Sequence, residues 1–116
     1  MRIVNRTTFL TLPVGTIYSV FRPDMFEGLY VKEKTIRHSE DDHVGDWFYT
    51  SLIGNLATKH SLDYERICDR LWAEPHHSTD LDFDTLNRWG DYDEHVRYGI
   101  YEKRDLDSLL AKLQRL

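Results

Sequence analysis

The chain has 116 residues, of which 41% are hydrophobic and 30% are charged. This length suits one domain, 1–116, with a single modest core, and the composition excludes a disordered chain or a fibrous repeat. The net charge of −5 argues against a protein that coats long nucleic acid by neutralising many phosphates.

The cysteine content and the apolar runs of the sequence further limit the class of protein that it can encode. Cys68 is the only cysteine, which excludes an intrachain disulfide and a cysteine-based zinc cluster and favours a reducing cytoplasm. The first residues lack the apolar core of a signal peptide, and no apolar run approaches the roughly 20 residues of a membrane-spanning helix. We therefore expect a soluble protein with no membrane partner.

The first third of the chain predicts short elements. Arg2 to Val4 reads as a very short strand, and Thr8 to Leu12 as a short helix that Pro13 ends. Thr16 to Phe21 is rich in β-branched and aromatic residues, and Gly28 to Lys34 alternates between two faces. These two strands are expected to form a hairpin.

The middle of the chain is harder to assign. Thr35 to Gly45 is polar without apolar periodicity, which predicts a solvated loop. Trp47 to Ile53 suits a strand or a helical face, and Gly54 after it favours the strand. Its three consecutive aromatics must place rings on both faces. One side is expected to join the core and the other to meet a partner or ligand, and the core or a subunit interface is the default interpretation.

The second half predicts two helices and one strand. Ser61 to Trp72 has the apolar spacing of an amphipathic helix that begins at a Ser cap, whereas Glu74 to Asp91 reads as a loop. Glu94 to Glu102 alternates as a strand, and Asp105 to Leu116 forms a capped helix with a leucine stripe. The predicted fold class is therefore α+β, with a small, mostly antiparallel sheet covered by two main helices.

Familiar catalytic and metal-binding patterns are weak. The alternating acids from Asp80 to Asp84 resemble a calcium loop, but Thr85 stands where that loop needs Gly. The His76 and His77 pair lacks the helical spacing of a catalytic zinc site. Glycine-rich phosphate loops and a nucleophile elbow are also missing. We predict no catalytic residues, no metal and no cofactor.

Polar and aromatic groups are concentrated from Leu86 to Asp93, which we predict to be a turn. Arg88 offers a planar fork for phosphate, and Asn87 can hydrogen-bond a base or ribose edge. Trp89 or Tyr92 can stack on a purine. The alternative is an ordinary Asn/Gly turn in which Arg88 pairs with a nearby carboxylate.

Both ends of the chain carry short motifs of one family. Met1 to Tyr18 is similar to the start of small phage proteins in which a short helix ends in L-P-x-G-T before an aromatic strand. Near the other end, an R-x-G-x-aromatic-acid turn, here Arg88 to Asp93, leads to a strand closing in Tyr101 to Lys103, and Asp105 opens a terminal helix. The chain thus resembles the first family of anti-Thoeris proteins, phage sponges that bind cyclic ADP-ribose isomers made by bacterial TIR-domain defence enzymes.

The resemblance implies a non-enzymatic protein that sequesters its ligand in the host cell cytoplasm without cleaving it. It also implies a homo-oligomer, either a dimer or an assembly of dimers, and some members of the family bind cyclic oligonucleotides as well. Ligand contact is implied at Asn87 and Arg88, and further at Phe83 and Arg104, which lie beside the matched motifs. The middle of the chain is unmatched.

Two other functions stay open on the sequence. An acidic protein with acidic loops can act as an inhibitor or adaptor that covers the basic surface of a host protein. A phosphodiesterase-like nuclease would need a metal or the pair His76 and His77.

Overall fold

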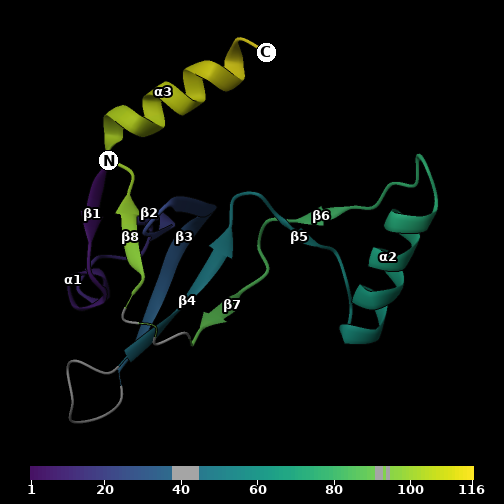
Figure 1. Cartoon of the computed structure of the whole chain (residues 1–116), viewed down its shortest axis with the longest axis horizontal. Helices are drawn as coiled ribbons and strands as arrows, with labels where there is room; N and C mark the ends of the chain where they lie inside the picture. The colour runs from purple at the N-terminus through teal and green to yellow at the C-terminus, as the bar shows by residue number, and fades with distance from the viewer. Residues whose placement is uncertain (38–44, 91–92, 94) are drawn as a thin grey trace.

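Six strands form one sheet in the order β1-β8-β2-β3-β4-β7, and all five pairings are antiparallel (Figure 1). The computed structural model describes residues 1–37, 45–90, 93 and 95–116. Tyr92 and most of the predicted polar loop before Gly45 lie outside these residues. The strands are β1 (Arg2–Val4), β2 (Ile17–Arg22), β3 (Met25–Arg37), β4 (Gly45–Ser51), β7 (Asn87–Trp89) and β8 (Arg97–Ile100).

A second, two-stranded sheet and three helices complete the described structure. They are α1 (Arg6–Leu10), β5 (Asn55–Leu56), α2 (Ser61–Ala73), β6 (Leu81–Asp82) and α3 (Lys103–Gln114). The predicted α+β class with a mostly antiparallel sheet is confirmed. No described helix is long and apolar enough to cross a membrane.

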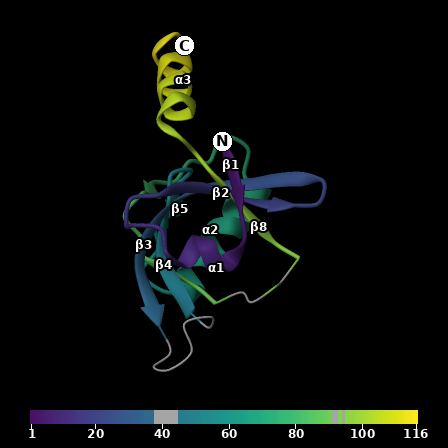
Figure 2. The ribbon, with the colours of Figure 1, turned by 90° about the vertical axis from the view of Figure 1, so that its left-hand side faces the viewer.

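The two main helices differ from the prediction in their placement. Phe9 and Leu10 of the short helix α1 are buried against the sheet, whereas α2 and α3 contain no buried residue. Both longer helices extend away from the six-stranded sheet, α2 on an arm with β5 and β6 (Figure 1) and α3 beyond the end of β8 (Figure 2). The reason is that α1 and a cluster of aromatic rings already fill the covered face of the sheet.

That aromatic cluster forms the core. The Phe9 ring lies 4.6 Å from Tyr18, 4.5 Å from Trp47 and 4.6 Å from Tyr98, and all four side chains are almost fully buried. Trp47 Nε1 donates a hydrogen bond to Tyr18 Oη at 2.9 Å. Burial raises the pKa of the Tyr18 phenol, which therefore stays neutral. The bond satisfies an indole N–H that would otherwise be costly to bury.

Several predicted elements are confirmed, whereas the predicted bounds of others are wrong. The strand at 2–4 and the β2–β3 hairpin are present, and β4 settles the ambiguous segment as a strand. The first helix begins at Arg6 rather than Thr8, because Asn5 Oδ1 caps it by accepting from the Thr8 amide. Residues 35–37 belong to β3 instead of a loop, because they pair with 45–47 of β4.

The predicted loop at 74–91 contains two strands, β6 and β7. Asn87–Trp89 is therefore an edge strand and not part of a turn, because it pairs with Trp47 to Tyr49 of β4. In the last helix, Asp105 is the third helical residue of a capping box, and Glu102 occupies the cap position. The amino-terminal ammonium lies 2.8 Å from the Asp105 carboxylate and, as the main cause, lowers the pKa of that group.

Tyr18→Phe tests the buried hydrogen bond directly. The variant keeps the ring but leaves Trp47 Nε1 unpaired, so we expect the free energy of unfolding to fall by about 1–3 kcal/mol in urea denaturation. Tyr101→Phe is the control, because Tyr101 Oη meets Ser19 Oγ at 2.9 Å while Ser19 keeps its bond to the Gly28 carbonyl. The control should cost about 0.5–1.5 kcal/mol, and equal losses would contradict a special role for the Trp47 bond.

Candidate functional site

A cleft of about 340 Å³ lies where the edge strand β7 meets β4 and the β2–β3 hairpin. It combines aromatic rings with charged groups at one place on the sheet. Its lining consists of Arg22, Glu27, Tyr30, Tyr49, Arg88, Trp89 and Gly90. Residues of four strands, β2, β3, β4 and β7, therefore build it, and the aromatic rings come from β3, β4 and β7.

Three aromatic rings form the floor of the cleft. Tyr49 lies 5.2 Å from both Tyr30 and Trp89, and Tyr30 lies 5.6 Å from Trp89, with all three pairs close to edge-on. Trp89 also stacks on the buried Trp47 at 5.5 Å with the planes 11° apart. The stack joins the half-buried floor to the core, which restricts the movement of the floor.

The strand register decides which side chains share this face. Trp89 is directly opposite Trp47, and Asn87 is directly opposite Tyr49. Side chains of directly opposite residues lie on the same face of an antiparallel sheet. Asn87 and Trp89 therefore flank Tyr49 on the cleft face, while the intervening Arg88 side chain projects to the other face.

Arg88 is engaged with a buried carboxylate on that other face. Its Nε donates to Asp46 Oδ2 at 2.6 Å, and only 3% of the Asp46 side chain is exposed, against 52% for Arg88. Pairing with a nearby carboxylate is the alternative that the sequence left open for Arg88. The ion pair fixes β7 against β4, and Arg88 is also among the residues that line the cleft.

Charged groups line the opposite rim. Arg22 Nε lies 3.1 Å from Glu27 Oε2, and its Nη1 lies 3.8 Å from Asp93 Oδ2. Burial raises the pKa of Tyr30, with Glu27 as the second cause, and burial raises the pKa of Tyr49, with Tyr30 as the second cause. Both phenols are therefore neutral hydrogen-bond donors near pH 7.

Trp89 also has a polar group without a partner. Its Nε1 is buried and makes no hydrogen bond among the described residues. Buried indole N–H groups are normally paired with protein or water, so Trp89 contributes an unsatisfied buried donor to the ring cluster of the cleft floor.

The other predicted ligand residues are dispersed. Asn87 lines a neighbouring hollow of about 350 Å³ toward α2, and its Nδ2 donates to the Thr85 carbonyl at 3.3 Å. Phe83 lies beside Gly54 on the α2 arm, and Arg104 is on α3, away from β7 (Figure 1). The structure thus unites Arg88 and Trp89, places Asn87 next to them, and leaves Phe83 and Arg104 outside this cleft.

Five cleft residues were not among the predicted ligand contacts, namely Arg22, Glu27, Tyr30, Tyr49 and Gly90. The signal for the two tyrosines was their alternation on strands predicted at 28–34 and 47–53. Turning that signal into a site requires knowing that these strands are neighbours and that β7 lies beside the second.

Neither potential metal ligands nor similarity to known proteins narrows the function of the cleft. Within the described ranges, no group of three or more His, Cys, Asp or Glu side chains is arranged to hold a metal ion. Comparisons with protein-family models, with curated proteins and with solved structures found no match. The fold and the cleft define a small α+β domain with an aromatic-floored site.

Arg88→Ala measures the ion pair that anchors β7. We expect a loss of about 1–3 kcal/mol in the free energy of unfolding, because the buried Asp46 carboxylate loses this partner but keeps a further interaction. Arg2→Ala on the opposite edge strand should change stability by about 0.5 kcal/mol or less. Urea denaturation of both variants measures these changes in the free energy of unfolding. A negligible effect of Arg88→Ala would exclude an anchoring role.

Proposed function

We propose that this protein is a non-catalytic, phage-encoded sponge that binds and sequesters a cyclic nucleotide second messenger in the aromatic cleft. Cyclic ADP-ribose isomers are the first ligands proposed, and cyclic oligonucleotides the second. Sequestration in the host cell cytoplasm would block host anti-phage defence. The observation that carries the proposal is the floor of Tyr30, Tyr49 and Trp89, which supplements the resemblance at the two chain ends.

The chemistry of the cleft supports this ligand class. Exposed aromatic faces stack on bases, and each stack is worth about 1–3 kcal/mol. Two neutral phenols supply donors for polar edges and phosphate oxygens, and Arg22 brings a cation to the rim. The cleft volume falls at the small end of the range for small-molecule sites, about 300–1,000 Å³.

A sponge needs only affinity, and that requirement fits a preorganised site. The Trp47–Trp89 stack and the Arg88–Asp46 pair hold the floor in place before any ligand arrives. Preorganisation reduces the entropy that binding must offset. General acid, base or nucleophile roles are unnecessary for this task, so the proposal assigns none.

Tyr49→Ala is the test of the cleft. Calorimetric titration with cyclic ADP-ribose isomers and cyclic di- and trinucleotides should show binding by the wild type and roughly 5- to 150-fold weaker binding by the variant. Tyr49→Phe should retain most of the affinity because the ring remains. Phe48→Ala, the neighbouring aromatic on the opposite face of β4, is the matched control and should bind normally.

Absence of heat with every one of these ligands would sink the proposal. Ligand recovered intact after heating the complex would support a sponge, whereas recovery of a cleaved product would contradict it. Mass spectrometry of the released ligand distinguishes the two.

Self-association through α3 is the second part of the proposal. Its leucines form one stripe, in which Leu110 and Leu113 are 55% and 56% exposed, and Leu116, just beyond the end of the helix, is 87% exposed. An apolar helical stripe without cover is typical of a helix that packs against another helix. We propose that α3 of one protomer packs on α3 of another, forming the dimer from which larger assemblies are built.

The double variant Leu110→Glu with Leu113→Glu should convert the oligomer into a monomer in sedimentation analysis, because four carboxylates would face one another in each dimer. Arg104→Glu on the same helix changes the net charge by the same amount but lies on the side opposite the leucines, none of which is three or four positions from it, so this variant should remain oligomeric. A wild type that sediments as a monomer would contradict the α3 interface.

An inhibitor or adaptor of a host protein is the second candidate function. The observation that favours it is Trp72 at the end of α2, whose side chain is 93% exposed, since exposed tryptophans are frequent anchors at protein interfaces. Tyr49→Ala also separates the two functions. Full anti-defence activity of that variant, together with retention of a host protein in a pull-down, would support the inhibitor over the sponge.

A further inference from the structure

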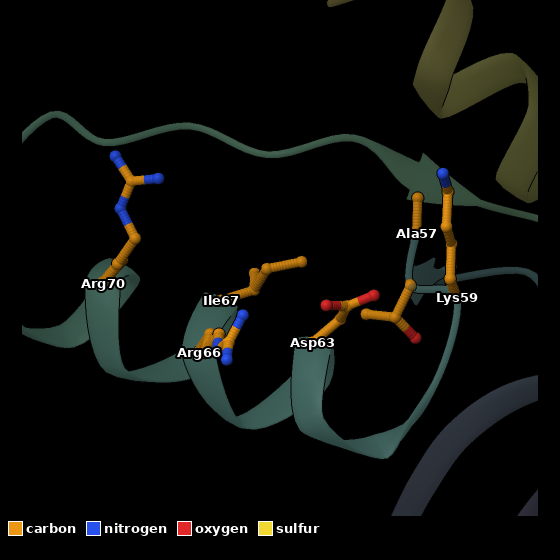
Figure 3. A pocket seen from close by; sticks show the side chains of 7 residues that line it. Ala57, Lys59, Asp63, Arg66, Ile67 and Arg70 are labelled. Atoms are coloured by element: carbon orange, nitrogen blue, oxygen red, sulfur yellow. The ribbon is translucent and has the colours of Figure 1, made fainter.

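A hollow larger than the aromatic cleft lies on the α2 arm, apart from that cleft. This arm groove has a volume of about 540 Å³ and is lined by Ala57, Thr58, Lys59, Asp63, Arg66, Ile67 and Arg70 (Figure 3). On α2, the positions 63, 66, 67 and 70 follow helical spacing and so lie along one side of the helix. The segment before α2 supplies the facing wall with Ala57 and Lys59.

Charge is segregated on this arm. Residues 55–85 contain seven Asp and Glu residues but only three basic side chains, Lys59, Arg66 and Arg70. All three basic side chains line the groove, whereas Asp63 is the one acid among the lining residues. An acidic arm therefore concentrates its positive charge in a single hollow, which creates a local field attractive to anions.

The cations of the groove are weakly engaged. Lys59 and Arg66 have neither an ion pair nor a hydrogen bond with any residue that the structure describes. Arg70 meets Glu74 at 3.4 Å on an exposed part of the helix, where such pairs are worth little. Asp63 is the one acid of the lining, so the three basic side chains leave the lining with a net charge of +2. Net positive charge is thus available to a ligand.

The geometry points to an organic phosphate, and we propose that the arm groove binds one through Lys59, Arg66 and Arg70. A guanidinium matches phosphate oxygens with paired donors, and a lysine adds a point charge. The hollow has room for much more than a phosphate group, and Ile67 and Ala57 offer an apolar wall for the organic part. This site is independent of the aromatic cleft and of the function proposed for it.

The test uses ribose 5-phosphate as the probe, with sulfate as a plain divalent anion for comparison, in calorimetry on the full chain at low ionic strength. Wild type should bind ribose 5-phosphate more tightly than sulfate. Lys59→Gln with Arg66→Gln should weaken that binding roughly tenfold or more. Both side chains are exposed, so the variant should fold normally, and its circular dichroism should match the wild type.

Two matched variants make the result specific. Lys112→Gln with Arg115→Gln removes the same charge from α3 and should leave binding intact. Tyr49→Ala should also leave it intact, which separates this site from the aromatic cleft. The proposal is overturned by absence of binding, by equal affinity for sulfate, or by equal losses in the Lys59/Arg66 variant and in either of these two controls.

Discussion

Burial of Trp47 is the constraint on which most of this structure depends. Its indole ring contacts Phe9 of α1, Tyr18 of β2, Tyr98 of β8 and Trp89 of β7, and its N–H is satisfied by the Tyr18 phenol. One residue thereby joins the short covering helix, the sheet centre and the sheet edge. In a chain of this size, where a single core must serve the whole domain, such convergence replaces the packing that two long helices usually provide.

At the edge of the sheet, the strand β7 belongs both to the packing of the core and to the candidate site. β7 is only three residues long, and a strand that short gains little from its backbone pairing. Trp89 stacking on one face and the Arg88–Asp46 pair on the other hold it from both sides. Because side chains alternate along the strand, Trp89 and Asn87 lie on the face of the cleft, whereas Arg88 pairs with Asp46 on the other face.

The sequence predicts the regular parts of the fold because their signals are local. Alternation places Tyr98 and Ile100 on the buried face of β8, and apolar spacing places α2 and α3 within one or two residues of their bounds. It fails for β7, because three residues leave no period to read and because Trp89 is held by a ring more than 40 positions earlier. The sequence also cannot predict that α2 and α3 extend away from the sheet, since an apolar stripe does not identify the surface against which it packs.

In the candidate site too, the features set by local sequence are predictable and those set by contacts between distant residues are not. Residue chemistry pointed to Arg88, Trp89 and Asn87, and the structure keeps those three together on one short strand. Tyr30 and Tyr49 were out of reach because they depend on the order of three strands, which is a property of the whole chain. Arg88 shows the limit of reading chemistry without geometry, since the carboxylate that engages it, Asp46, lies 42 positions away.

The α2 arm has a different consequence for the behaviour of the molecule. It joins the main sheet through the two-residue strands β5 and β6, and α2 contributes no buried residue to any core. The free energy needed to open the arm is therefore separate from the free energy of global unfolding, and its amides should exchange with solvent long before those of β2 or β8. Substitutions on the arm should accordingly affect global stability less than substitutions in the aromatic core.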